Sequence, residues 1–123
     1  MNVATLRPYM YGGIEDWGGV TSPSYKTFEK KYRNYLKKVC KNHGWELVKF
    51  SPNHYCFSCF IKKDDKYVYM SVSDVRYFSK EWYNNILVRT AKSDHDYTGG
   101  SNNYTDLDGL EKNVKRLFER NLY

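Results

Sequence analysis

The sequence predicts an α+β fold in a single domain, with element order α-β-β-β-β-α and two helices packed on one face of an antiparallel sheet. Two segments with helical periodicity, one near each end, enclose four short runs with strand-type alternation. A chain of 123 residues, 41% of them apolar, is large enough for one hydrophobic core and too small for two.

Residues 1–20 have no sustained period and contain two Gly-Gly steps, so we expect an irregular N-terminal arm ahead of one domain at residues 21–123. The arm carries Tyr9, Tyr11 and Trp17. This content is too apolar for a free tail, and we expect the arm to pack on the domain or on a partner.

The clearest predicted helix spans residues 22–44. Ser22 suits the N-cap, Pro23 the first helical position and Gly44 the C-cap. One face is apolar, with Tyr25, Phe28, Tyr32, Tyr35, Leu36 and Val39 at helical spacing. The opposite face is a basic stripe, made of Lys26, Lys30, Arg33, Lys37 and Lys41. Many charged helix faces are only solvated, but here Glu29 alone interrupts the positive sign, which favours a binding surface.

Strand-type runs at residues 45–50, 54–62, 66–75 and 85–92 predict an antiparallel meander, with a tight turn at KDDK. In the third run Val68, Met70 and Val72 alternate with tyrosines and serines. Its aliphatic face should therefore meet the helices. The last helix is expected to start at Thr105 or Asp106, with an apolar side formed by Leu107, Leu110, Val114, Leu117 and Phe118.

Four potential soft ligands, Cys40, His43, Cys56 and Cys59, have spacings that zinc sites use. However, Cys56 and Cys59 lie in a strand-like run, where residues three apart point to opposite faces. We therefore predict no metal and no cofactor, with the cysteines packed in the core. A redox dithiol is the remaining alternative, without the βαβ pattern that would support it.

The segment RTAKSDHDYTGGSNNY, residues 89–104, could be catalytic. Arg89 and Lys92 could neutralise a phosphate while His95 exchanges a proton near neutral pH. Asp94 and Asp96 could orient that histidine or hold a divalent ion.

The same segment could instead be a recognition loop. Its Asp, Ser and Asn side chains favour local bonds to the backbone, and Gly99-Gly100 permits positive φ. Such an ordered loop would present Tyr97 and Tyr104. We favour recognition, with Arg89, Lys92, Tyr97 and Tyr104 as candidate binding residues.

Charge and aromatic content indicate the partner class. The net charge is +6, which favours polyanionic partners, with nucleic acid first among them. Thirteen tyrosines suit interfaces and base-stacking surfaces. No apolar run could span a membrane, no signal peptide is evident, and three cysteines are few and odd in number. We expect a cytoplasmic protein of a bacterial host cell, with no membrane association; its oligomeric state is left open.

In size, charge, aromatic richness and α+β order, the chain resembles small proteins carried by phages and conjugative elements of Gram-positive bacteria, including anti-CRISPR inhibitors. The resemblance rests on no shared motif, so it assigns no site residues and implies only a stoichiometric binder. The element order is also similar to double-stranded RNA-binding domains, but the basic cluster that opens their last helix is replaced here by TDLDGLEK.

These observations predict a small, basic, non-enzymatic protein that binds nucleic acid or a nucleic-acid-handling enzyme, including as an inhibitor of a bacterial CRISPR nuclease. The alternative is a small metal-independent ribonuclease of the toxin type, with Arg89, Lys92 and His95 at its centre.

Overall fold

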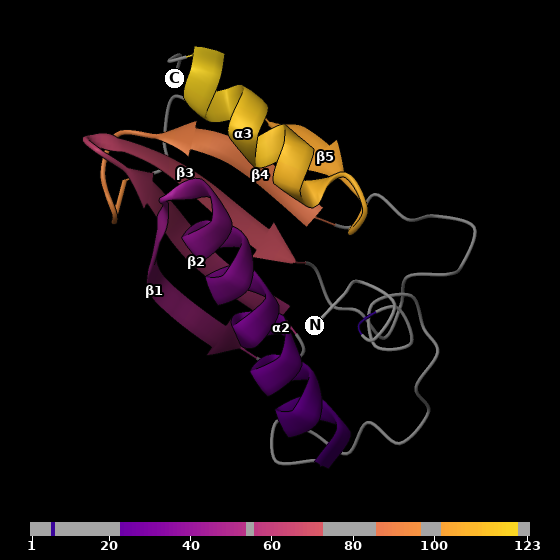
Figure 1. Ribbon diagram of the computed structural model, residues 1–123. Helices are drawn as coiled ribbons and strands as arrows, with labels where there is room; N and C mark the ends of the chain where they lie inside the picture. Colours follow the sequence, from indigo (N-terminus) through magenta and orange to yellow (C-terminus); the bar gives the residue numbers. More distant parts are fainter. Residues whose placement is uncertain (1–5, 7–22, 54–55, 73–85, 97–101, 121–123) are drawn as a thin grey trace.

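The computed structural model describes residues 6, 23–53, 56–72, 86–96 and 102–120. The elements are α2 (Pro23–His43), β1 (Glu46–Asn53), β2 (Cys56–Lys63), β3 (Lys66–Val72), β4 (Ile86–Ala91), β5 (Asn103–Thr105) and α3 (Leu110–Arg120). The strands form one antiparallel sheet in the order β1-β2-β3-β4-β5, and both helices lie on the same face of it (Figure 1). The predicted α+β fold is confirmed, and the structure adds β5 inside the segment expected to be a loop.

The boundaries of α2 follow from two residues with restricted or unusual backbones. The helix begins at Pro23, and it ends before Gly44, whose φ is 71°. The N–H of Trp45 donates to the carbonyl oxygen of Cys40 at 2.8 Å, and the N–H of Gly44 donates to the carbonyl oxygen of Lys41 at 3.4 Å. This is a Schellman motif, which satisfies the last helical carbonyls and turns the chain toward β1.

The core lies between the helices and the sheet and is strongly aromatic at the α2 end. Phe57 of β2 is its centre, stacked on Tyr32 with ring centroids 5.6 Å apart and edge-on to Phe28 at 4.8 Å. Leu6, the one described residue of the N-terminal arm, is also fully buried in this core. The other arm residues lie outside the described part of the chain.

A polar and aromatic contact joins the two helices directly. His43 Nε2 lies 2.7 Å from Glu111 Oε1, and the His43 ring stacks on Trp45 with centroids 4.2 Å apart. Trp45 in turn packs against Phe118 of α3 at 5.2 Å. The C-terminal end of α2 is therefore fixed beside α3.

A crowded capping turn precedes α3. The helix begins at Leu110, four or five residues later than the predicted start at Thr105 or Asp106. The carboxylate of Asp106 accepts the N–H of Gly109 at 2.7 Å. The side-chain amide of Asn113 donates to Thr105 Oγ1 at 3.0 Å and to the Gly109 carbonyl at 2.8 Å. A Cβ at Gly109 would lie 2.7 Å from Thr105 Oγ1, so this turn has room only for glycine.

A β-bulge interrupts β1 at Lys49 and Phe50. Val48 pairs with Phe60 and Ser51 with Ser58, so two residues of β1 oppose one residue of β2. Lys49 has φ 51°, an uncommon backbone conformation for a non-glycine residue. The bulge places Lys49 out of the regular alternation of the strand.

Candidate functional site

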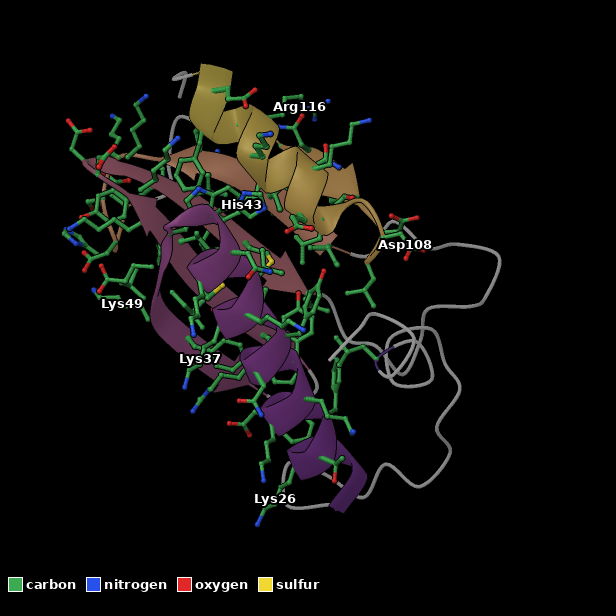
Figure 2. All side chains as sticks on the ribbon, viewed as in Figure 1. Lys26, Lys37, His43, Lys49, Asp108 and Arg116 are labelled. Atoms are coloured by element: carbon green, nitrogen blue, oxygen red, sulfur yellow. The ribbon has the colours of Figure 1, made fainter. Side chains whose placement is uncertain are left out.

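The basic stripe predicted on the first helix is present as a straight row of lysines. Lys26, Lys30, Lys37 and Lys41 are all exposed on α2. With 3.6 residues per turn and a rise of 1.5 Å, they fall within about 60° of the helix circumference and extend over about 22 Å. The row lies opposite the apolar face that packs on the sheet, and Figure 2 shows Lys26 and Lys37 projecting from the same helix.

These four lysines have no acidic partner among the described residues. The first turn of α2 contains no acidic side chain, and Glu29, further along, is paired with Arg33 at 3.4 Å. The row therefore carries positive charge that no described side chain compensates.

Arg33, predicted as a fifth member of the stripe, has a different environment. Its guanidinium lies 4.6 Å from the centroid of the Phe50 ring, in addition to its pair with Glu29. The contact with Phe50 joins α2 to β1, whereas the pair with Glu29 lies within the helix. A binding role for Arg33 remains a prediction, with part of its donor capacity already used.

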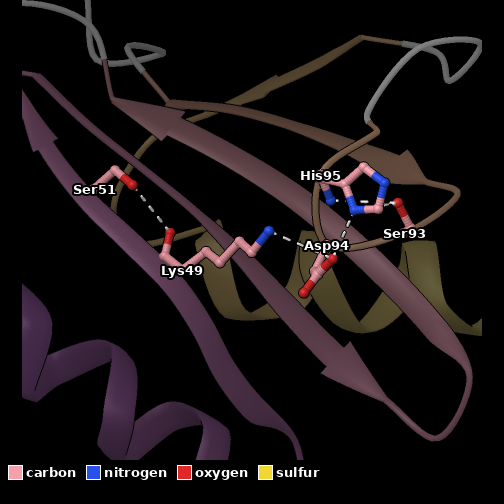
Figure 3. Close-up of polar contacts among 5 residues, drawn as sticks. All are labelled: Lys49, Ser51, Ser93, Asp94 and His95. Carbon is pink, nitrogen blue, oxygen red and sulfur yellow. Dashed lines mark hydrogen bonds and ion pairs between the residues drawn. The ribbon is translucent and has the colours of Figure 1, made fainter.

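The candidate catalytic histidine lies in a tight turn after β4. Lys92 N–H donates to the Asp96 carbonyl at 2.9 Å and closes the turn. Asp94 Oδ1 lies 2.9 Å from His95 Nδ1 and 3.6 Å from Lys49 Nζ (Figure 3). The hydrogen bond with His95, and then the charge of Lys49, lowers the pKa of the Asp94 carboxyl.

In the described part of the chain, His95 makes no hydrogen bond or ion pair with Arg89 or Lys92, the other two members of the alternative catalytic set. The described contacts of the His95 side chain are with Ser93 and Asp94, and this side chain is 73% exposed. Arg89 is half-buried within β4, opposite Tyr69, and Lys92 is exposed at the start of the turn. The histidine is therefore a solvated member of a local hydrogen-bonded turn.

Of the two tyrosines expected in a recognition loop, Tyr104 lies in β5 and is 61% exposed. Tyr97 and residues 98–101 lie outside the described residues. The recognition segment thus contributes an exposed aromatic side chain at the edge of the sheet, where the sequence suggested an irregular loop.

The cysteines that suggested a zinc site are core residues where their side chains are described. Cys40 and Cys59 are buried free thiols, as predicted, and the side chain of Cys56 lies outside the described residues. Burial raises the pKa of Cys40 to about 12, and burial followed by the nearby Cys40 raises that of Cys59. Zinc requires thiolates, which this environment disfavours. Among the described residues, no three potential ligands gather at one point.

Comparison of the chain with protein-family models, curated proteins and solved structures found no match. The resemblance to small phage and mobile-element proteins therefore remains a prediction. In the described part of the chain, no helix combines the length and the apolar character needed to cross a membrane.

Proposed function

We propose that this protein is a small, non-enzymatic binding protein that engages nucleic acid through the lysine row of α2. The observation that carries the proposal is the straight row of Lys26, Lys30, Lys37 and Lys41, which has no acidic partner among the described side chains. Each lysine that neutralises a phosphate releases a condensed counterion, so a row of this kind supports salt-dependent binding to a phosphate backbone. The net charge of +6 adds long-range attraction to the same partner.

The chemistry of the row favours the phosphate backbone over the bases. A lysine ammonium acts as a point charge and lacks the planar fork with which arginine reads a base edge. Binding through this surface should therefore depend only weakly on the base sequence of the nucleic acid.

A nucleic-acid-handling enzyme is the other partner of this proposal, including a CRISPR nuclease that the protein would inhibit. The channels of such enzymes are positively charged. They would repel α2, so an enzyme partner would need a separate acidic surface. The chemistry of the row therefore favours nucleic acid itself. The cytoplasm of a bacterial host cell is the location that we propose for this partner.

The test is the salt dependence of binding to a labelled DNA duplex. Log affinity of the parent should fall linearly with log salt, with a slope near 0.9 per neutralised phosphate. The Lys30→Ala, Lys37→Ala variant should flatten this slope by roughly two units.

A matched control removes the same charge elsewhere. Lys63→Ala, Lys66→Ala changes the turn between β2 and β3 and should leave the slope close to that of the parent. Equal slopes and affinities for the parent and the α2 variant would overturn the proposal, because the row would then be only a solvated helix face.

The contact of His95 with Asp94 is the one observation that favours the ribonuclease alternative. If the protein is a binder, incubation with RNA should give no fragments and His95→Ala should leave binding unchanged. Cleavage that disappears with His95→Ala and titrates near neutral pH would instead establish an enzyme.

A further inference from the structure

The lysine row of α2 is divided into two pairs. Lys26 and Lys30 lie about one helical turn apart, and so do Lys37 and Lys41. With a rise of 1.5 Å per residue, the members of a pair are about 6 Å apart along the helix axis, whereas Lys30 and Lys37 are about 10.5 Å apart. All four side chains are exposed, and Figure 2 shows one member of each pair, Lys26 near the start of α2 and Lys37 further along.

The interval between the two pairs offers little free positive charge. Arg33 lies in this interval, but it is half-buried, and its guanidinium lies 3.4 Å from Glu29 and 4.6 Å from the centroid of the Phe50 ring. Asn34, which is exposed on the same side of the helix, is neutral. The positive charge of the row is therefore concentrated in the two pairs.

The charges of neighbouring elements leave both pairs with an excess of positive charge. Glu46 opens β1 just after the helix, and Glu111 of α3 contacts His43 at 2.7 Å. In the described part of the chain, neither carboxylate makes an ion pair with a lysine of the row. Lys38 is also exposed, lies about 60–100° round the helix from the second pair, and adds a cation at this end.

The dimensions of the row select a form of nucleic acid. The interval of about 10.5 Å between the pairs is close to the width of the major groove of B-form DNA, about 12 Å, and exceeds that of the minor groove, about 6 Å. The exposed side chains described on α2 are all polar, whereas Tyr25, Tyr32 and Tyr35 are buried. Single strands are held by rings that stack on bases as well as by cations, so this surface suits a duplex better.

We propose that α2 lies across the major groove of a DNA duplex and contacts both strands. Lys26 and Lys30 meet phosphates of one strand, and Lys37 and Lys41 meet phosphates of the other. The inference rests on the proposed function and adds to it the form of the nucleic acid and the orientation of the helix on it.

A charge-conserving exchange tests the spacing of the pairs. Lys30→Asn, Asn34→Lys moves one lysine about 6 Å along the axis, into the interval, without changing the net charge. Its affinity for a labelled DNA duplex of about sixteen base pairs, measured by fluorescence anisotropy in about 0.1 M salt, should fall roughly five- to tenfold. The salt slope should flatten by about 0.9, which corresponds to the loss of one neutralised phosphate.

Two controls accompany the exchange, and the melting temperature of each variant checks its folding. Lys30→Arg, Lys37→Arg keeps a cation at both original positions and should retain the parent affinity for the duplex within about twofold. The exchange variant should bind a single strand of the same length within about twofold of the parent, because a flexible strand can rearrange its phosphates around the moved lysine.

Three results would overturn the inference. These are an exchange variant with the duplex affinity and salt slope of the parent, an equal loss of affinity on the single strand, and a parent that binds the single strand as tightly as the duplex.

The inference and the proposed function can fail separately. If Lys30→Ala, Lys37→Ala flattens the salt slope while the exchange does not, the lysine row binds DNA but does not span the groove in this way. If neither variant changes duplex binding, the proposed function fails as well.

Discussion

The two faces of the same sheet carry alternate residues of the same strands, and these residues differ in burial. Toward the helices, Phe57, Met70 and Val88 are buried almost completely. Their neighbours Ser58 and Ser71 point the other way and remain half-exposed. The contrast teaches that substitutions one position apart should differ in their effect on stability, with a large loss on the helix-covered face and a small one on the other.

The largest effect should come from removing the centre of the aromatic core. Phe57→Ala should lower the free energy of unfolding by about 3–5 kcal/mol, because it leaves a cavity among several rings. Ser58→Ala, one residue further along, should change it by less than about 0.5 kcal/mol. Urea unfolding of both variants measures the difference; similar losses would show that the two faces are not distinct.

On the helix-covered side, stability should also fall when a side chain is added where the backbone is crowded, as at Gly109. Gly109→Ala should cost about 1–3 kcal/mol, because its Cβ would collide with the Thr105 hydroxyl and strain the turn before α3. Thermal and urea unfolding test this directly. A variant as stable as the parent would mean that the turn relaxes without loss.

Buried ionisable groups on the helix-covered side should make stability fall at alkaline pH. In the unfolded chain the Cys40 thiol ionises near its ordinary pKa of 9.0, whereas in the folded protein its pKa is about 12. The unfolded state therefore gains by ionising first, and stability should decline as pH rises from about 9 toward 12. The pKa of Tyr35, raised from 10.0 to about 12 by burial and then by Glu111 and Asp108, adds to this decline above pH 10.

Cys40→Ala provides the control, since it should reduce the slope of unfolding free energy against pH between about 9 and 10. An identical slope in the parent and the variant would show that Cys40 is accessible to solvent. Alkylation at pH 8, mapped by mass spectrometry, should leave Cys40 and Cys59 unmodified until the protein is unfolded.

The smallest effect is expected at the exposed turn after β4, which contains Asp94 and His95. Asp94 should titrate below its ordinary pKa of 3.8, and His95→Ala should move its pKa back toward that value. A lowered pKa contributes stability above about pH 4 that is lost in more acidic solution. Carboxyl NMR titration measures the shift. We expect no change in melting temperature at neutral pH, since exposed ion pairs contribute little; a clear decrease would mean that the turn supports the fold.

The sequence predicted those features that depend on local spacing. Pro23 and Gly44 mark the ends of α2, and the lysine row follows from helical periodicity alone. The buried residues of β3 followed from period-two alternation. The turn at KDDK is also confirmed, with Lys63 paired to Lys66.

Features that depend on long-range register were not predictable in this way. β5 is three residues long and exists because Tyr104 and its neighbours pair with β4. The bulge at Lys49 occurs in an ordinary strand-like run, and the contact of His43 with Glu111 joins residues far apart in the chain. The alignment of Phe60, Tyr69 and Arg89 on the face turned away from the helices was not predictable either, because these residues come together only once three strands are paired.

The β-bulge in β1 also affects the tendency of two copies of this protein to associate through their sheet edges. Among the described strands β1 lies at the edge of the sheet, where unpaired backbone groups could accept a strand from another chain. The twist at Lys49 and the missing N–H of Pro52 interrupt that ladder of donors and acceptors. This edge is therefore poorly suited to edge-to-edge aggregation, and β1 should meet partners through its side chains.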